Sequence, residues 1–134
     1  MPTIQIERQI IQFIAWSTIL MGVSQIGFSD YLLPLLGAPV EATASHLLAT
    51  LGFFLIIVSG TLLLAFKHSE ALPVVLIWSI TQKIGASLFM AWGIYKGVFS
   101  MLVLGIVLFD FASGLLMFDF RRRHQHALNE VIHD

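Results

Sequence analysis

Four apolar runs, each of about 20 residues or more, dominate this 134-residue chain and limit what it can fold into. They cover residues 9–28, 46–66, 72–95 and 98–120. A helix needs about 20 predominantly apolar residues to cross a hydrocarbon core of about 30 Å. Its backbone groups must also form their hydrogen bonds without water. The sequence therefore predicts an all-α polytopic membrane protein, with residues 1–134 forming one four-transmembrane-helix antiparallel bundle.

The composition supports the same class of protein. Hydrophobic residues make up 57% of the chain and charged residues only 11%, whereas a soluble domain carries about 25% charged residues. The main basic run, Arg121-Arg122-Arg123, directly follows a predicted membrane helix, so the sequence gives no support to nucleic-acid binding. The chain has no cysteine, which excludes disulfides and thiol redox chemistry. The lipid bilayer is the first partner that this composition predicts.

The positive charges predict the orientation in the membrane. Four spans place both termini on one side, together with Arg8, Lys67 and the run Arg121 to Arg123. Lys96 lies on the other side with Asp30. Because cytoplasmic loops are enriched in Lys and Arg, we expect a multi-pass protein of the cell (inner) membrane. Both termini and the polar tail, residues 121–134, would then lie in the cytoplasm.

One charged residue stands near the middle of each of the last two spans, which a tight turn at residues 95–97 joins. Lys83 and Asp110 each lie about 13 residues from that turn, or roughly 20 Å at a rise of about 1.5 Å per residue. An antiparallel hairpin therefore places a cation and an anion at the same depth. A charge at mid-bilayer costs about 2.5–3.5 kcal/mol on insertion scales, so we expect these two side chains to pair.

Further polar residues lie within about one helical turn of the expected pair, on the same two spans: Ser79, Gln82, Ser87 and Ser113. Two interpretations remain open. In the first, the pair is a buried salt bridge that fixes how the two spans pack. In the second, the pair and its polar neighbours line a pocket or a proton path, in which a lysine and a carboxylate are suitable acid–base partners.

A second group of polar residues lies where the first span ends and the second begins. It contains Gln25, Asp30 and His46, and a contact between Asp30 and His46 fits this arrangement. The group forms interfacial hydrogen bonds in one interpretation and the entrance of a pocket that runs down to Lys83 in the other. One histidine with scattered carboxylates falls short of the usual ligand count of a metal site, so we predict no metal site here.

The connection between the first two spans, residues 29–45, is too interrupted to be a span. It contains Pro34, Gly37 and Pro39, and such residues mark turns and loops. Its apolar part, residues 31–36, is expected to lie flat at the membrane surface or to fold back onto the mouth of the bundle.

The chain resembles small bacterial four-helix membrane proteins of the DoxX-like group. The resemblance lies in Met21-Gly22 of the first span, the long first connection with its prolines, and Lys83-Ile84-Gly85 of the third span. Asp110, within Leu108-Phe109-Asp110-Phe111 of the fourth span, completes it. The resemblance implies a four-helix bundle, and it implies no catalytic residue or cofactor.

Three functions of different classes follow from these observations. The sequence most favours a non-enzymatic accessory or helix-packing subunit, which would join a homo-oligomer or a larger membrane complex through the small residues of its second and fourth spans. The first alternative is a binder or enzyme for a lipid-like, apolar ligand in an intramembrane pocket. The second is a small proton-coupled transporter that acts as a dimer. No reaction type or cofactor can be assigned, so whether the chain is an enzyme stays open.

Overall fold

Helices form nearly the whole of the computed structural model, which describes residues 2–68 and 70–133. The elements are, in chain order, α1 (Pro2–Gly27), α2 (Ser29–Leu36), α3 (Ala42–Ala65), α4 (Leu72–Tyr95), the short 3-10 helix η1 (Met101–Val103) and α5 (Leu104–His133). Four of them, α1, α3, α4 and the η1–α5 segment, are long and apolar enough to cross a membrane. The predicted all-α polytopic bundle is confirmed, and the chain is a small multi-pass membrane protein.

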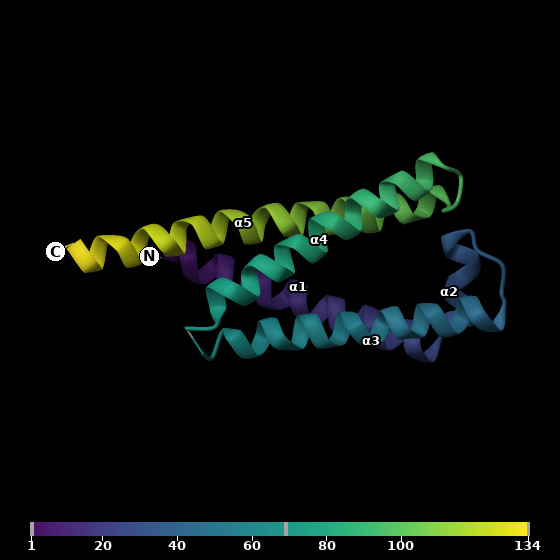
Figure 1. The fold of residues 1–134 in the computed structure, drawn as a ribbon, viewed down its shortest axis with the longest axis horizontal. Helices are drawn as coiled ribbons and strands as arrows, with labels where there is room; N and C mark the ends of the chain where they lie inside the picture. The colour runs from purple at the N-terminus through teal and green to yellow at the C-terminus, as the bar shows by residue number, and fades with distance from the viewer. Residues whose placement is uncertain (1, 69, 134) are drawn as a thin grey trace.

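The four long helices are arranged as two pairs (Figure 1). α1 packs along α3, and α4 packs along α5, with far less contact between the pairs than within them. Both chain termini lie at one end of the molecule, which we call the terminal end. α2 and the turn between α4 and η1 lie at the opposite end, the loop end.

Glycine residues bring the helices of each pair close together. A Cβ atom added to Gly52 of α3 would lie 2.5 Å from the carbonyl oxygen of Gly22 in α1. A Cβ atom added to Gly22 would likewise lie 2.5 Å from the carbonyl oxygen of Gly52. In the other pair, a Cβ atom on Gly114 of α5 would lie 2.6 Å from Cγ1 of Ile84 in α4. Small residues allow this close backbone approach in membranes, where dispersion contacts replace the hydrophobic effect as the driving force.

The hydrophobic core occupies the half of the bundle nearest the terminal end. All four long helices contribute to it, and it consists of Ile11, Ile14, Ala15, Leu62, Ala65, Phe66, Leu72, Leu76, Met117 and Phe120. The two pairs converge at this end and separate toward the loop end, where α2 lies beside them (Figure 1). The half near the loop end is therefore less tightly packed.

Two polar contacts reinforce the terminal end. Arg8 of α1 donates a hydrogen bond of 2.8 Å to the carbonyl oxygen of Phe66, just past the last turn of α3, where unpaired carbonyl groups accumulate. Arg123 of α5 forms ion pairs with Glu7 of α1 at 3.1 Å and with Asp119 at 2.7 Å. The arginine run that marks the predicted cytoplasmic side thus also holds α5 against α1.

α2 folds back onto the loop end and joins the two helix pairs there. Ser100 follows the α4–η1 turn, and its backbone N–H donates to the carbonyl oxygen of Leu36 at 2.9 Å. Its hydroxyl donates to the carbonyl oxygen of Leu35 at 2.6 Å. Gly37, with φ of 87°, lets the chain leave α2 beside Ser100. Residues 31–36 were expected either to lie flat at the membrane surface or to fold back onto the mouth of the bundle. In the structure they fold back onto it.

Several helix ends differ from the predicted spans. α1 begins at Pro2 and α3 at Ala42, both earlier than expected, because polar residues outside the apolar runs remain helical. α5 begins at Leu104, later than residue 98, because Gly97 adopts φ of 71° and residues 98–100 turn toward α2. α5 then continues through the predicted polar tail to His133.

Replacing Gly52 by alanine should loosen the α1–α3 pair. The added methyl group would overlap the Gly22 carbonyl, and overpacking of this kind costs about 1–3 kcal/mol. Gly60→Ala on the same helix is the matched control, because a Cβ there meets no described atom within 4 Å. Thermal unfolding of the two purified variants should show a lower midpoint for Gly52→Ala only. Equal midpoints would contradict the close packing at Gly52.

Candidate functional site in the intramembrane cavity

Lys83 and Asp110 form a buried ion pair between α4 and α5. The Lys83 Nζ atom lies 2.6 Å from Oδ1 of Asp110, and both side chains are almost completely buried. The equal depths of Lys83 and Asp110 predict that they pair, and the structure confirms this contact. A hydrogen bond between two charged groups is short and about twice as strong as a neutral one, so the pair ties α4 to α5 near the middle of the bundle.

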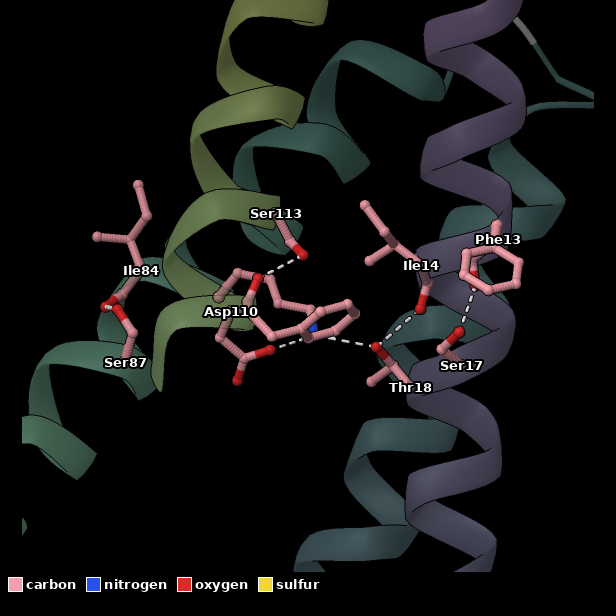
Figure 2. A network of polar contacts seen from close by, with 10 residues as sticks. Phe13, Ile14, Ser17, Thr18, Ile84, Ser87, Asp110 and Ser113 are labelled. Carbon is pink, nitrogen blue, oxygen red and sulfur yellow. Dashed lines mark hydrogen bonds and ion pairs between the residues drawn. The ribbon is translucent and has the colours of Figure 1, made fainter. Parts of the chain in front are cut away.

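Thr18 of α1 is the third member of this group, and it was not among the residues predicted from the sequence. Lys83 donates a second hydrogen bond to Thr18 Oγ1 at 2.9 Å, and Thr18 in turn donates to the carbonyl oxygen of Ile14 at 2.9 Å. Figure 2 shows Thr18 extending from α1 toward Asp110 on α5. Helical spacing could have found it, because Thr18, Met21 and Gln25 share one face of α1.

Phe109 shields the ion pair on one side. The Lys83 Nζ atom lies 5.3 Å from the centre of the Phe109 ring, a distance at which an ammonium group is attracted to the face of an aromatic ring. The ammonium of Lys83 therefore contacts a carboxylate, a hydroxyl and an aromatic ring.

A cavity of about 730 Å³ lies between the two helix pairs, in the half of the bundle nearest the loop end. Its lining residues come from all four long helices, α2 and the turn before η1: Ser17, Thr18, Met21, Gln25, Leu36, Leu48, Leu51, Phe54, Leu55, Val58, Gln82, Lys83, Ala86, Phe89, Met90, Phe99, Gly105, Ile106, Phe109 and Asp110. The volume lies within the range of about 300–1,000 Å³ that is typical of small-molecule sites. The cavity exists because the helix pairs separate toward α2.

The polar and apolar parts of the cavity are separated along its length. Thr18, Gln82, Lys83 and Asp110 lie at its deep end, next to the core, and form what we call the floor. The walls between the floor and the loop end consist mainly of Leu, Phe, Met and other apolar side chains. Gln25 lies two helical turns from Thr18 toward the loop end, so it provides a polar group near the mouth.

The two glutamines of the cavity have unused hydrogen-bonding groups. Gln25 and Gln82 both line the cavity, and neither makes a side-chain hydrogen bond to any residue that the structure describes. The Oε1 atom of Gln25 is buried without such a partner. A buried polar group without a partner costs about 1–3 kcal/mol, and Gln25 Oε1 is such a group, whereas no atom of Gln82 is both buried and unpaired.

The three predicted serines do not line this cavity. Ser87 donates to the carbonyl oxygen of Ile84 at 2.8 Å, and Ser113 donates to that of Phe109 at 2.6 Å. Figure 2 shows these local contacts on α4 and α5. Ser79 lies at a separate cavity of only about 10 Å³ beside Thr18. Of the predicted polar patch, only Gln82 reaches the cavity together with Lys83 and Asp110.

The contact between Asp30 and His46 that fits the sequence does not occur as an ion pair among the described residues. Asp30 instead accepts a hydrogen bond from Ser45. Both Asp30 and His46 are exposed at the loop end, outside the cavity lining. Gln25 is therefore the one predicted mouth residue that faces the cavity.

Comparisons with known proteins do not assign this site. No family model, no curated protein and no solved structure matched the chain.

The ion pair can be tested by a double-mutant cycle with Lys83→Met and Asp110→Asn. Each single variant leaves one buried charge without its partner, which should lower the free energy of unfolding by about 3–5 kcal/mol. The double variant should lose less than the sum of the two, because it leaves no unpaired charge. Unfolding in mixed detergent micelles would give the free energy of unfolding of the wild type, the two single variants and the double variant. Additive losses would contradict a direct interaction.

Proposed function

We propose that this membrane protein binds a lipid-like small molecule in the cavity between its two helix pairs. The observation that supports the proposal is the form of the cavity, which has apolar walls above a floor made by Thr18, Gln82, Lys83 and Asp110. Small-molecule sites are mostly apolar concavities in which a few polar groups fix the orientation of the ligand. Ionisable residues inside membrane spans usually face the interior of the bundle, and they often mark binding sites or pathways for substrates and ions.

The position of the ion pair favours binding over a purely structural role. Lys83 and Asp110 lie at the border between the core and the cavity, so their polar atoms are placed beside the cavity as well as between the two helices. Both residues line the cavity while they hold α4 to α5. The same pair can thus stabilise the bundle and present polar groups to a ligand.

The small residues give less support to an accessory subunit that binds partner helices. Gly52 is packed against Gly22 and Gly114 against Ile84 within the chain itself. Gly60 of the second span and Gly105 of the fourth meet no described atom within 4 Å of an added Cβ, but Gly105 lines the cavity. The contacts of Gly52 and Gly114 within the chain leave fewer small residues for a partner helix.

The proposal extends to the orientation in the membrane. Arg8, Lys67 and the run Arg121 to Arg123 belong to the terminal end, and Lys96 belongs to the loop end. By the positive-inside rule, we propose that the terminal end faces the cytoplasm of a cell whose inner membrane holds the protein. The cavity would then open toward the outer half of the bilayer.

The plan of four spans with a long first connection, together with Lys83-Ile84-Gly85 and Asp110, also supports a proposed relationship to the DoxX-like group. Nothing in the proposed ligand binding depends on this relationship.

Ala86→Phe should block the cavity. Ala86 lines the cavity on α4, so a phenyl group there would occupy ligand space. Ala91, exposed on the same helix and outside the cavity lining, provides the control Ala91→Phe. The probe is Nile red, an uncharged apolar dye, and its affinity is measured in nanodiscs. The affinity should fall by about tenfold or more in Ala86→Phe, a loss of at least about 1.4 kcal/mol. It should stay near the wild-type value in Ala91→Phe. Equal binding by both variants would contradict the proposal.

The orientation can be tested by labelling, because the natural chain has no cysteine. Lys96→Cys at the loop end should react with a membrane-impermeant maleimide in intact bacterial cells that express the protein. Lys67→Cys at the terminal end should react only after the membrane is opened. The reverse pattern would place the terminal end outside the cytoplasm.

A further inference from the structure

We infer that the ligand is an uncharged amphiphile whose polar head both donates and accepts hydrogen bonds, such as a long-chain alcohol, with that head on the floor of the cavity. This inference rests on the proposed function and adds the chemical class of the ligand. It follows from the charge balance of the floor, its unused hydrogen-bonding groups and the position of the cavity walls.

The charge balance of the floor excludes a charged head. Lys83 and Asp110 neutralise each other at 2.6 Å, and the lining of the cavity contains no other ionised side chain among the described residues. A carboxylate head would bring a second anion next to Asp110, and an ammonium head would bring a second cation next to Lys83. Either would add an uncompensated charge to a site of low dielectric constant, where the desolvation cost is several kcal/mol per ion.

The unused groups of the ion pair call for both a donor and an acceptor. Asp110 uses Oδ1 for Lys83, and Oδ2 has no hydrogen-bond partner among the described residues. An ammonium group has three N–H donors, and Lys83 uses two of them, for Asp110 and Thr18. The carboxylate oxygen needs a hydrogen-bond donor, and the N–H group needs an acceptor. A head group that only accepts would therefore bond to Lys83 and leave Asp110 Oδ2 without a partner.

Gln82 presents the same requirement beside the pair. Its amide lines the cavity next to Lys83 and makes no side-chain hydrogen bond to a described residue. An amide carries one acceptor and two donors, so either orientation of this group is satisfied by a hydroxyl. An ether or ester oxygen, which only accepts, cannot bond to Gln82 Oε1 or to Asp110 Oδ2.

The walls show where such a molecule would come from. Leu51, Phe54 and Phe89 line the cavity and are also 59%, 56% and 71% exposed. In a chain that spans a membrane, side chains exposed along the middle of the helices contact lipid tails. The cavity therefore borders the hydrocarbon region directly, and a lipid-soluble molecule can enter from the bilayer with its tail along the apolar walls.

A matched series of ligands tests the head group. Tetradecanol, its methyl ether, tetradecanoic acid and tetradecylamine share one tail and differ only in the head. Each compound is tested for its ability to displace Nile red from wild-type protein in nanodiscs. Nanodiscs with Ala86→Phe show how much of the signal comes from partition into the lipid alone. Tetradecanol should compete about tenfold better than the other three, because only its hydroxyl can both donate to Asp110 and accept from Lys83 without adding a charge. Native mass spectrometry should show one alcohol bound per chain.

Two variants give an independent test of the floor. Gln82→Leu should reduce the preference for the alcohol over its methyl ether severalfold, whereas Gln9→Leu, at an exposed glutamine of α1 outside the cavity, should not. Asp110→Asn leaves the Lys83 ammonium without a counter-charge, so a carboxylate would then complete the site. This variant should prefer tetradecanoic acid over tetradecanol. If it does not fold, the two glutamine variants still decide the question.

The outcomes separate this inference from the proposed function. If Nile red binds and the acid, amine or methyl ether competes as well as the alcohol, the cavity binds ligands but the inferred head group is wrong. The same holds if Gln82→Leu keeps the full preference for the alcohol. If Nile red and all four compounds bind equally to wild type and Ala86→Phe, the proposed binding function itself is wrong.

Discussion

A cation and an anion in the middle of a membrane bundle must be kept together, and the rest of this structure depends on that requirement. Each charge alone would cost about 2.5–3.5 kcal/mol or more at mid-bilayer. Lys83 and Asp110 meet at 2.6 Å because the α4–α5 hairpin carries them to the same depth. Thr18 accepts a second hydrogen bond from Lys83 and so connects α1 to the hairpin. The contact between the two helix pairs thus has a polar centre as well as an apolar core.

The bundle changes character at the level of this pair. Toward the terminal end, the side chains of all four long helices form a continuous core, reinforced by the Arg123–Glu7 ion pair. Toward the loop end, the helix pairs separate, and Ser100 joins them through its two hydrogen bonds to α2. The space between them is the cavity. Lys83 and Asp110 therefore lie where a packed core meets an open, apolar cavity.

Sequence reasoning could predict the features that depend on position along a single helix or hairpin. The four spans follow from length and apolarity, and the Lys83–Asp110 contact follows from equal distances to one turn. It left a pocket at Lys83 as one of two open interpretations and could not predict its size, because the volume depends on the angle between the two helix pairs. Thr18 was missed because a threonine inside a helix commonly bonds only to its own backbone, and this one does so as well. Asp30 accepts its hydrogen bond from Ser45, one residue before His46, and a choice between two adjacent side chains depends on helix rotation that the sequence does not specify.

Site-specific photo-crosslinking tests most directly whether a ligand occupies the cavity. Phe53 and Phe54 are neighbours on α3 with nearly equal exposure, 54% and 56%, but only Phe54 lines the cavity. Each would be replaced in turn by a photoreactive phenylalanine analogue and irradiated in the native membrane, and the adducts would be weighed by mass spectrometry. Position 54 should give one dominant small adduct that position 53 does not give, since position 53 should capture a mixture of bulk lipids. The same lipid mixture at both positions would contradict a ligand site between the two helix pairs.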